Sequence, residues 1–119
     1  LVYGERPPPQ LISVRRDGTE APLPLAEGAW HNPRFSPDGR RLSADLSGPD
    51  GRDVWVLDLA SGRLERATTA RNGHDAIWLP DGRGLLFLSD ESGVIGLRRT
   101  MLGVSTPAES LLTGPLVGA

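Results

Sequence analysis

The sequence predicts an all-β protein built from a repeated unit of about 43 residues. The stretch Phe35–Arg40 (FSPDGR) returns as Trp78–Arg83 (WLPDGR), and the two turn prolines, Pro37 and Pro80, lie 43 residues apart. Proline fixes φ, aspartate bonds to the local backbone and glycine accepts a positive φ, so Pro-Asp-Gly predicts a tight turn in both copies. No stretch shows a capped apolar period of 3.6 residues that is long enough for a helix.

The first complete unit spans residues 29–73 and is predicted to contain four short strands. Apolar and alternating runs bounded by turn residues place them at residues 33–36, 41–46, 54–57 and 64–68. Residues 47–51 are expected to form the loop between the second and third strands. The third strand is apolar at every position, which predicts cover on both of its faces. Trp55, in this strand, and Trp78 are expected in the layer between neighbouring units.

The second unit, residues 74–114, repeats this order, and shorter pieces flank the two units. Its four strands are predicted at residues 76–79, 84–88, 94–97 and 109–112. The glycines Gly28, Gly73 and Gly114 are interpreted as the ends of successive units. Residues 1–28 predict three strands, at 1–3, 11–14 and 22–25, with an Asp-Gly hairpin turn at Asp17-Gly18. Residues 115–119 are interpreted as a remnant strand.

Four short strands in a unit of this length are typical of a β-propeller blade, a four-stranded antiparallel sheet. The chain therefore holds about three blades, as an incomplete blade (residues 1–28), two full blades (29–73 and 74–114) and the remnant (115–119). An open arc of blades exposes sheet edges and apolar faces. We therefore expect either a partial propeller within a larger one or half of a six-bladed ring completed by oligomerisation. In the ring, residues 116–118 would supply the missing first strand to the blade that begins at Leu1.

Composition narrows the classes of partner. The chain has 38% hydrophobic and 24% charged residues, which is typical of a folded protein. A net charge of −2 without a basic patch argues against nucleic acid as a partner. No apolar run reaches the roughly 18 residues of a membrane-spanning helix, so we expect no membrane insertion. The absence of cysteine excludes disulfides and thiol nucleophiles.

Motifs for catalysis are missing from the sequence. There is no Gly-x-Ser-x-Gly elbow and no phosphate-binding glycine loop, and two histidines without a third ligand do not make a metal site. We therefore expect no enzyme activity, no cofactor and no metal. Asp50-Gly51-Arg52-Asp53 has a faint calcium-loop spacing but lacks the downstream glutamate. The acidic residues are expected at strand ends and turns, where aspartate caps local amides; they are Asp45, Asp50, Asp53, Asp58, Asp90 and Glu91.

The two histidines occupy equivalent positions in the repeat. His31 and His74 each lie six residues before a turn proline, at the start of the predicted innermost strand. One interpretation is structural, with each histidine bonded to a loop. The other is that His31, Asn32, His74 and Asp75 surround the mouth of the central channel and line a site for a ligand or peptide. Both interpretations remain open at this point.

The repeat resembles that of a known family. Residues 33–40 (PRFSPDGR), 52–58 (RDVWVLD) and 61–64 (SGRL) are similar to the TolB-type propeller repeat, a WD-like repeat with a Ser-Pro-Asp-Gly turn. The order of segments also resembles propellers attached to bacterial Ser/Thr kinases and, more loosely, the N-terminal propellers of prolyl-oligopeptidase-type peptidases. The second copy departs at Leu79, which replaces serine, and at Gly96, where we expect weaker strand packing.

The resemblance implies a non-catalytic propeller module that binds a protein or peptide or acts as a scaffold. The expected partners are therefore a protein or peptide, together with either copies of the chain in a homo-oligomer or the rest of a larger propeller. One alternative is the propeller part of a prolyl-oligopeptidase-like peptidase, which gates access of substrate to a catalytic domain outside this chain. Another is a structural protein that assembles into a ring. The compartment stays open, although the resemblance favours a periplasmic or extracytoplasmic location.

Overall fold

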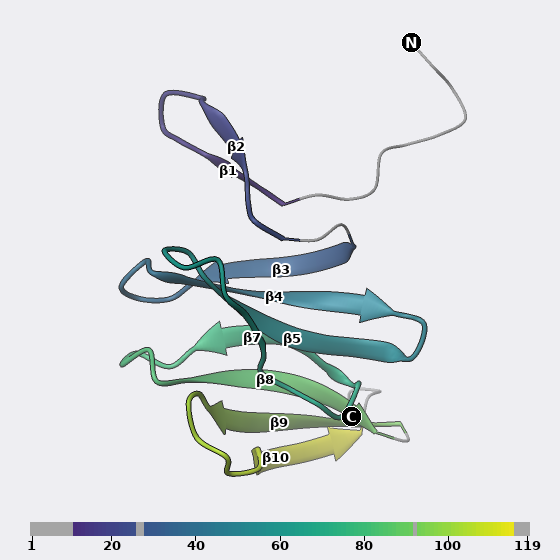
Figure 1. Cartoon of the computed structure of the whole chain (residues 1–119). Helices are drawn as coiled ribbons and strands as arrows, with labels where there is room; N and C mark the ends of the chain where they lie inside the picture. The colour runs from purple at the N-terminus through teal and green to yellow at the C-terminus, as the bar shows by residue number, and fades with distance from the viewer. Residues whose placement is uncertain (1–10, 26–27, 92, 116–119) are drawn as a thin grey trace, which may run out of the picture.

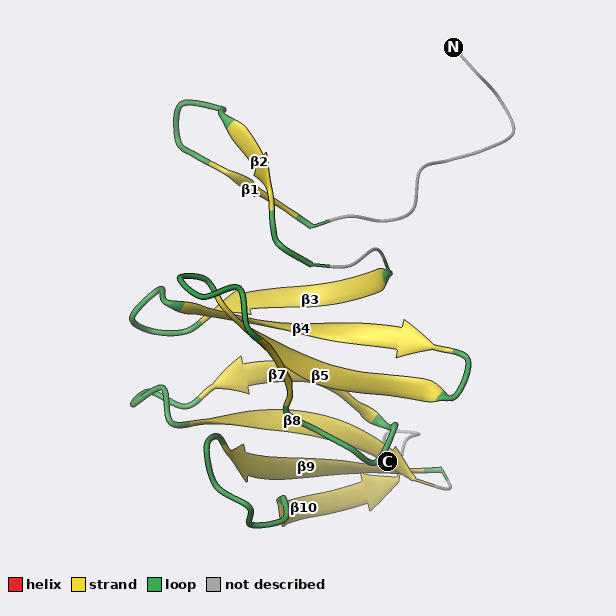
Figure 2. Cartoon of the chain, in the orientation of Figure 1, coloured by secondary structure: helices red, strands yellow, loops and turns green. Residues whose placement is uncertain are grey.

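The described part of the chain is all-β, as the sequence predicts. The computed structural model describes residues 11–25, 28–91 and 93–115. Figure 2 shows strands and connecting loops in this part of the chain, with no helix. The strands form one two-stranded sheet and two four-stranded sheets, and all pairs are antiparallel. The strand predicted at residues 1–3 lies outside the described residues; of the remnant predicted at 115–119, Pro115 ends β10 and the rest also lies outside them.

The first four-stranded sheet is a meander with the order β3-β4-β5-β6. Its strands are β3 (Ala29–Phe35), β4 (Arg41–Gly48), β5 (Gly51–Asp58) and β6 (Leu64–Arg66). The loop predicted at residues 47–51 is wrong, because only Pro49 and Asp50 lie outside the strands. Gly48 pairs with Gly51, and the positive φ of Gly51, 134°, lets the chain reverse in two residues.

The second four-stranded sheet repeats this meander with the order β7-β8-β9-β10. Its strands are β7 (Gly73–Trp78), β8 (Gly84–Glu91), β9 (Val94–Met101) and β10 (Glu109–Pro115). Gly73 does not close the preceding sheet, because it pairs with Ser89 at the start of β7. The expected weakness at Gly96 is not seen. β9 continues through this glycine, and a Cβ there would approach the Ser89 hydroxyl oxygen to 3.0 Å.

A short hairpin precedes the two large sheets (Figure 1). It joins β1 (Ile12–Val14) and β2 (Glu20–Pro22) through the predicted Asp-Gly turn, in which Gly18 has a φ of 90°. Hydrogen bonds from the side chain and the backbone of Thr19 lower the pKa of Asp17 in this turn. The strand that the sequence predicts at residues 22–25 is found earlier in the chain, as β2 at residues 20–22. β2 ends at Pro22, and one further bond joins the Leu23 N–H to the Leu11 carbonyl at 3.2 Å before Pro24, which lacks an N–H group.

The Pro-Asp-Gly turns form in both sheets with the same backbone. Gly39 and Gly82 each have a φ of 72°. The Asp38 carboxylate accepts from the backbone N–H of Arg40 at 2.9 Å and from the Ser36 hydroxyl at 2.7 Å, and these bonds lower its pKa. In the second turn Leu79 replaces that serine, and Asp81 keeps the backbone bond, to the N–H of Arg83 at 2.9 Å.

The core lies between the two four-stranded sheets, which lie next to each other in Figure 1. It consists of Val54 and Val56 from β5 and Ala76, Leu85 and Phe87 from β7 and β8, all of them buried. These five side chains form the inter-blade layer. It joins segments that are remote in sequence, so each sheet depends on the other for cover.

The two tryptophans that the sequence singles out take different places. Trp78 packs against the inter-blade layer, as predicted, and its indole N–H donates to the carbonyl oxygen of Arg34 at 2.9 Å. The guanidinium of Arg41 covers its ring at 4.8 Å. The prediction for Trp55 is wrong as regards this layer. Trp55 alternates with Val54 and Val56 along β5 and therefore points to the opposite face of the sheet.

Replacing a side chain of the inter-blade layer tests its contribution to stability. Leu85 is 0% exposed, so Leu85→Ala removes buried methyl groups and leaves a cavity. We expect the free energy of unfolding to fall by about 2–5 kcal/mol, measured by urea denaturation. Val14→Ala, at an exposed position in β1, should change it by less than about 0.5 kcal/mol. Equal effects of the two changes would contradict a core in this layer.

Candidate functional site

The candidate site lies where the first strand of each large sheet bulges. The pairing register of β3 with β4 shifts between His31 and Arg34, and that of β7 with β8 shifts between His74 and Ile77. Within these bulges Asn32 has a φ of 54° and Asp75 a φ of 52°. Asparagine and aspartate tolerate the left-handed region better than most residues. The two positions, 43 residues apart, therefore share one unusual backbone conformation.

A buried carboxylate joins the two bulges. Asp45 in β4 is 0% exposed, and its Oδ2 accepts from the side-chain amide of Asn32 at 2.9 Å and from the backbone N–H of Asp75 at 3.0 Å. Its Oδ1 has no hydrogen-bond partner among the described residues. The position expected for Asp45, at a strand end or turn, is wrong, because it lies inside β4 opposite Val54. One side chain thus connects both halves of the site.

His74 is held between two carboxylates. The ring is 6% exposed, with Nδ1 at 2.6 Å from Asp75 Oδ2 and Nε2 at 2.9 Å from Asp90 Oδ2. The structural interpretation expected a bond to a loop, but both partners belong to strands. Asp75 and Asp90 remain partly exposed, so each carboxylate can also receive a donor from outside. This arrangement fixes the orientation of the ring and holds two acceptors at the surface.

His31 has a different environment in spite of its equivalent position. It pairs with Asp45 across β3 and β4, but its side chain is exposed. The residues that correspond to Asp75 and Asp90 in the first sheet, 43 residues earlier, are Asn32 and Ser47, so His31 lacks both carboxylates that hold His74. Asn32 is exposed as well. The structure therefore brings Asn32 and Asp75 together through Asp45, buries His74 and leaves His31 open to solvent.

A hollow of about 410 Å³ lies beside His74 and Asp90. Its other walls include Arg52, Arg71 and Asn72, from β5 and the connection between the sheets. This connection is fixed by backbone bonds, from the N–H of Arg52 to the Arg71 carbonyl at 3.0 Å and from the N–H of Asp90 to the Asn72 carbonyl at 3.2 Å. The site consequently has an open side next to its most polar residues.

A second buried carboxylate anchors the same connection. Asp53 pairs with the guanidinium of Arg66, and its Oδ1 accepts from the Thr68 hydroxyl at 2.7 Å and the Arg71 N–H at 3.1 Å. Its expected position at a strand end is also wrong, since it lies inside β5. Sequence reasoning missed the roles of Asp45 and Asp53. The signal was present for Asp53, which shares its face of β5 with Trp55 and Leu57, but not for Asp45, which shares its face of β4 with Ser43 and Ser47.

Neither a metal-binding cluster nor a membrane-spanning helix is found among the described residues. Within the ranges given above, no three side chains of histidine, aspartate or glutamate are grouped so as to hold a metal ion. In the same ranges there is no helix with the length and apolar character needed to cross a membrane. The arrangement provides hydrogen-bond donors and acceptors on a fixed backbone.

Comparison with known proteins identifies the repeat. No family model matches the chain. The chain is 30% identical over 113 residues to the Tol-Pal system protein TolB of Helicobacter pylori strain 26695, and 29% identical to that of strain J99. In both comparisons the match covers 92% of this chain and 27% of the relative. The chain thus spans about a quarter of the length of the curated relatives it matches.

Solved structures agree with this result. TolB from Acinetobacter baumannii has 26% identity and a TM-score of 0.68, over 81% of this chain and 24% of that one. A putative TolB from Agrobacterium tumefaciens has 21% identity and a TM-score of 0.74, over 87% and 41% of the two chains, and supports the fold. The predicted resemblance is confirmed: the chain carries TolB-type β-propeller repeats, and its fold is that of a partial propeller.

Replacing the two histidines separates their roles. His74→Ala removes a ring that is 6% exposed together with its hydrogen bonds to two carboxylates, so we expect the free energy of unfolding to fall by about 1–3 kcal/mol. His31→Ala removes an exposed side chain and should change it by less than about 0.5 kcal/mol. Urea denaturation of both variants measures the difference. Equal losses would show that the two positions are structurally equivalent after all.

Proposed function

We propose that this TolB-type propeller segment is a non-catalytic module that binds a protein or peptide at the bulges of β3 and β7. The observation that carries the proposal is the buried Asp45 carboxylate, which joins the two bulges and holds polar groups beside them at the surface. The binding residues would be His31, Asn32, His74 and Asp75, with Asp90 added by the structure. The central channel mouth remains their proposed location.

The backbone around this site is organised before a partner arrives. Asn32 and Asp75 hold left-handed conformations that Asp45 stabilises through hydrogen bonds. His74 is locked between Asp75 and Asp90. A site fixed in this way loses little conformational entropy on binding, which favours affinity.

The relatives support a protein as the partner. Both TolB relatives are named as proteins of the Tol-Pal system. We propose that a component of such a system, or a peptide segment of one, is bound here. A role as the gate of a peptidase needs a catalytic domain outside this chain, and no contact of the described residues favours it.

Peptide selection tests the binding site. We would select peptides from a displayed library against the immobilised chain and measure their affinities by isothermal titration calorimetry. His31→Ala should weaken the selected peptides about tenfold, because its side chain is exposed at the site. Arg16→Glu, in the exposed β1–β2 turn, is the control and should leave the affinity unchanged. Selected peptides that bind both variants equally would contradict the proposed site.

A second candidate function, self-assembly, is favoured by the outer faces of the two large sheets. In the first sheet, the face that carries Ser43, Asp45 and Val54 is covered by β7 and β8. The equivalent residues of the second sheet, 43 positions later, are Leu86, Leu88 and Leu97. The equivalent face of the second sheet also carries Ile77, 48% exposed, and Leu112, 66% exposed. The outer face of the second sheet is apolar and exposed, so it requires a cover, whereas Leu42 and Ala44 on the outer face of the first sheet are each 3% exposed and so already buried.

The surface that would cover the outer face of the second sheet is the outer face of the first sheet. Inside the chain, the second sheet covers the first with the face that carries Leu85, Phe87 and Arg98. The equivalent residues of the first sheet, 43 positions earlier, are Leu42, Ala44 and Trp55 on its outer face. A second copy can place its first sheet on the second sheet of its neighbour, in a head-to-tail contact that generates a ring, if the groups that bury Leu42 and Ala44 in the single chain move aside. A further blade of a larger propeller would use the same faces. The division into blades at residues 28, 73 and 114 belongs to this proposal.

Sedimentation velocity tests self-assembly. We expect the chain to sediment as a closed oligomer at micromolar concentration. Leu112→Asp, which places a charge on the exposed apolar face, should shift it toward monomer. The charge faces solvent in the monomer, so the unfolding transition should change little. A wild-type chain that remains a compact monomer would contradict the ring.

A further inference from the structure

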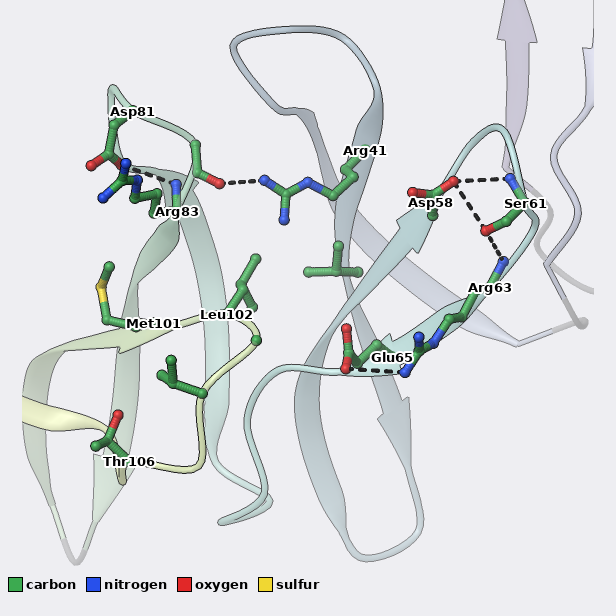
Figure 3. A pocket seen from close by; sticks show the side chains of 14 residues that line it. Arg41, Asp58, Ser61, Arg63, Glu65, Asp81, Arg83, Met101, Leu102 and Thr106 are labelled. Atoms are coloured by element: carbon green, nitrogen blue, oxygen red, sulfur yellow. Dashed lines mark hydrogen bonds and ion pairs between the residues drawn. The ribbon is translucent and has the colours of Figure 1, made fainter.

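A groove lies between the two large sheets, where β4 begins and where β5 and β9 end (Figure 3). It is bordered by the β5–β6 turn, the β7–β8 turn and the loop of residues 102–108, and it has a volume of about 1000 Å³. It continues into a second hollow of about 530 Å³, and both are lined by Glu65, Met101, Leu102 and Val104. The second hollow extends along β6 toward Ala70. The combined groove is therefore elongated, which suits an extended chain better than a compact ligand.

The floor of the groove is apolar. Val56, Met101, Leu102 and Val104 all line it. Val104 is 57% exposed although it lies in the groove, so part of its apolar surface is without cover. Burial of such a side chain by a partner is favourable by about 25 cal/mol for each Å² removed from water.

This floor depends on a difference between the two sheets. The loop of the second sheet begins with a bond from the Leu102 N–H to the Arg83 carbonyl at 2.9 Å. Its counterpart in the first sheet begins in the same way, from Leu59 to Arg40 at 3.0 Å. The first loop returns to β6 at residue 64, whereas the second continues to residue 108 before β10 begins. The additional residues bring Val104 to the groove.

Three acidic residues line the groove; Asp58 and Asp81 are engaged by their own turns, and Glu65 pairs with Arg63. Asp58 Oδ1 accepts from the Ser61 N–H at 2.9 Å, the Ser61 hydroxyl at 3.0 Å and the Ala60 N–H at 3.1 Å. The bonds from the backbone and side chain of Ser61 lower the pKa of Asp58. Asp81 accepts from the Arg83 N–H in the same manner. Figure 3 shows these carboxylates turned toward the turns to which they belong.

The guanidinium groups are less engaged. Among the described residues the Arg83 side chain has no hydrogen-bond or ion-pair partner, and the residue is exposed. Arg63 lies 3.7 Å from Glu65 in an exposed pair, which is weak. Arg41 is occupied by Trp78 and by the Gly82 carbonyl. Two arginines on opposite sides of the groove, Arg63 and Arg83, therefore remain available for a carboxylate.

We propose that this inter-blade groove binds an extended peptide segment in which apolar side chains alternate with acidic ones. The apolar side chains would cover Val104 and Leu102, and the carboxylates would pair with Arg83 and Arg63. Alternation suits an extended chain, because successive side chains point in opposite directions. The arginines of this site, Arg63 and Arg83, do not line the hollow beside His74, although the second hollow and that hollow meet at Asn72.

Labelled peptides of defined sequence test the groove. The first is a fluorescein-labelled octapeptide, Ser-Gly-Leu-Glu-Val-Glu-Gly-Ser, amidated at its C-terminus so that only the glutamates carry negative charge. The second has lysine in place of both glutamates, and the third has serine in place of leucine and valine. Fluorescence anisotropy at low salt measures their affinities. We expect the first peptide to bind at least tenfold more tightly than either of the others.

Matched variants locate the binding. Arg83→Glu should weaken the acidic peptide about fivefold or more and reduce its preference over the lysine peptide. Val104→Ser should weaken it about threefold. The controls are Arg16→Glu and Val14→Ser, which make the same changes at exposed positions in the β1–β2 hairpin. His31→Ala, at the bulge of β3, should have no effect, and thermal unfolding by circular dichroism verifies the fold of each variant.

Three results would overturn the proposal. They are the absence of saturable binding by the acidic peptide, equal affinity for the acidic and lysine peptides, and equal effects of Arg83→Glu and Arg16→Glu. A peptide that carries its only carboxylate at a free C-terminus provides one more comparison. Its tighter binding would assign the groove to chain ends rather than to internal acidic residues, and would likewise overturn the proposal as stated.

Discussion

Burial of Val54, Val56, Ala76, Leu85 and Phe87 between the two sheets is the interaction on which the rest of the structure depends. A four-stranded sheet with apolar residues on both faces cannot be stable alone, and each buried side chain of this size contributes about 1.5–3 kcal/mol. Polar contacts border this layer at both rims, with Asp45 to the Asp75 N–H at one and Trp78 to the Arg34 carbonyl at the other. The apolar layer supplies most of the energy, and the directional bonds determine how the sheets are oriented.

The bulges show how a backbone cost is offset locally. A residue other than glycine in the left-handed region costs on the order of 1–3 kcal/mol. Hydrogen bonds to a charged group contribute about 1.5–3 kcal/mol each, and Asp45 accepts one from each bulge. The buried carboxylate in turn needs these donors, because desolvation of an unpaired charge is expensive. The bulges and the carboxylate therefore stabilise each other, and neither would persist without its partner.

The strands and the Pro-Asp-Gly turns could be predicted from the sequence because local rules govern them. The alternation of apolar and polar residues predicted β4, and the turn at Pro37-Asp38-Gly39 predicted where this strand begins. The two-residue turn at Pro49-Asp50 could not be predicted in this way, since it depends on the pairing of Gly48 with Gly51 across strands. The site was predicted in part. The equivalence of His31 and His74 followed from the repeat, but the burial of His74 depends on Asp90, a residue of another strand.

Differences between equivalent positions indicate why the polar site lies at this junction. Asp45 corresponds to Leu88 in the second sheet, and Asp53 corresponds to Gly96. The outer face of the second sheet therefore has no carboxylate at the position where the first sheet has Asp45. A neighbour that covers this outer face would make an apolar contact there and could not form the bridge between two bulges. Among the described residues, the bridged pair of bulges belongs to the junction of β3, β4 and β7. A partner that requires this polar arrangement would consequently recognise this junction, whereas an apolar neighbour would recognise the outer face of the second sheet.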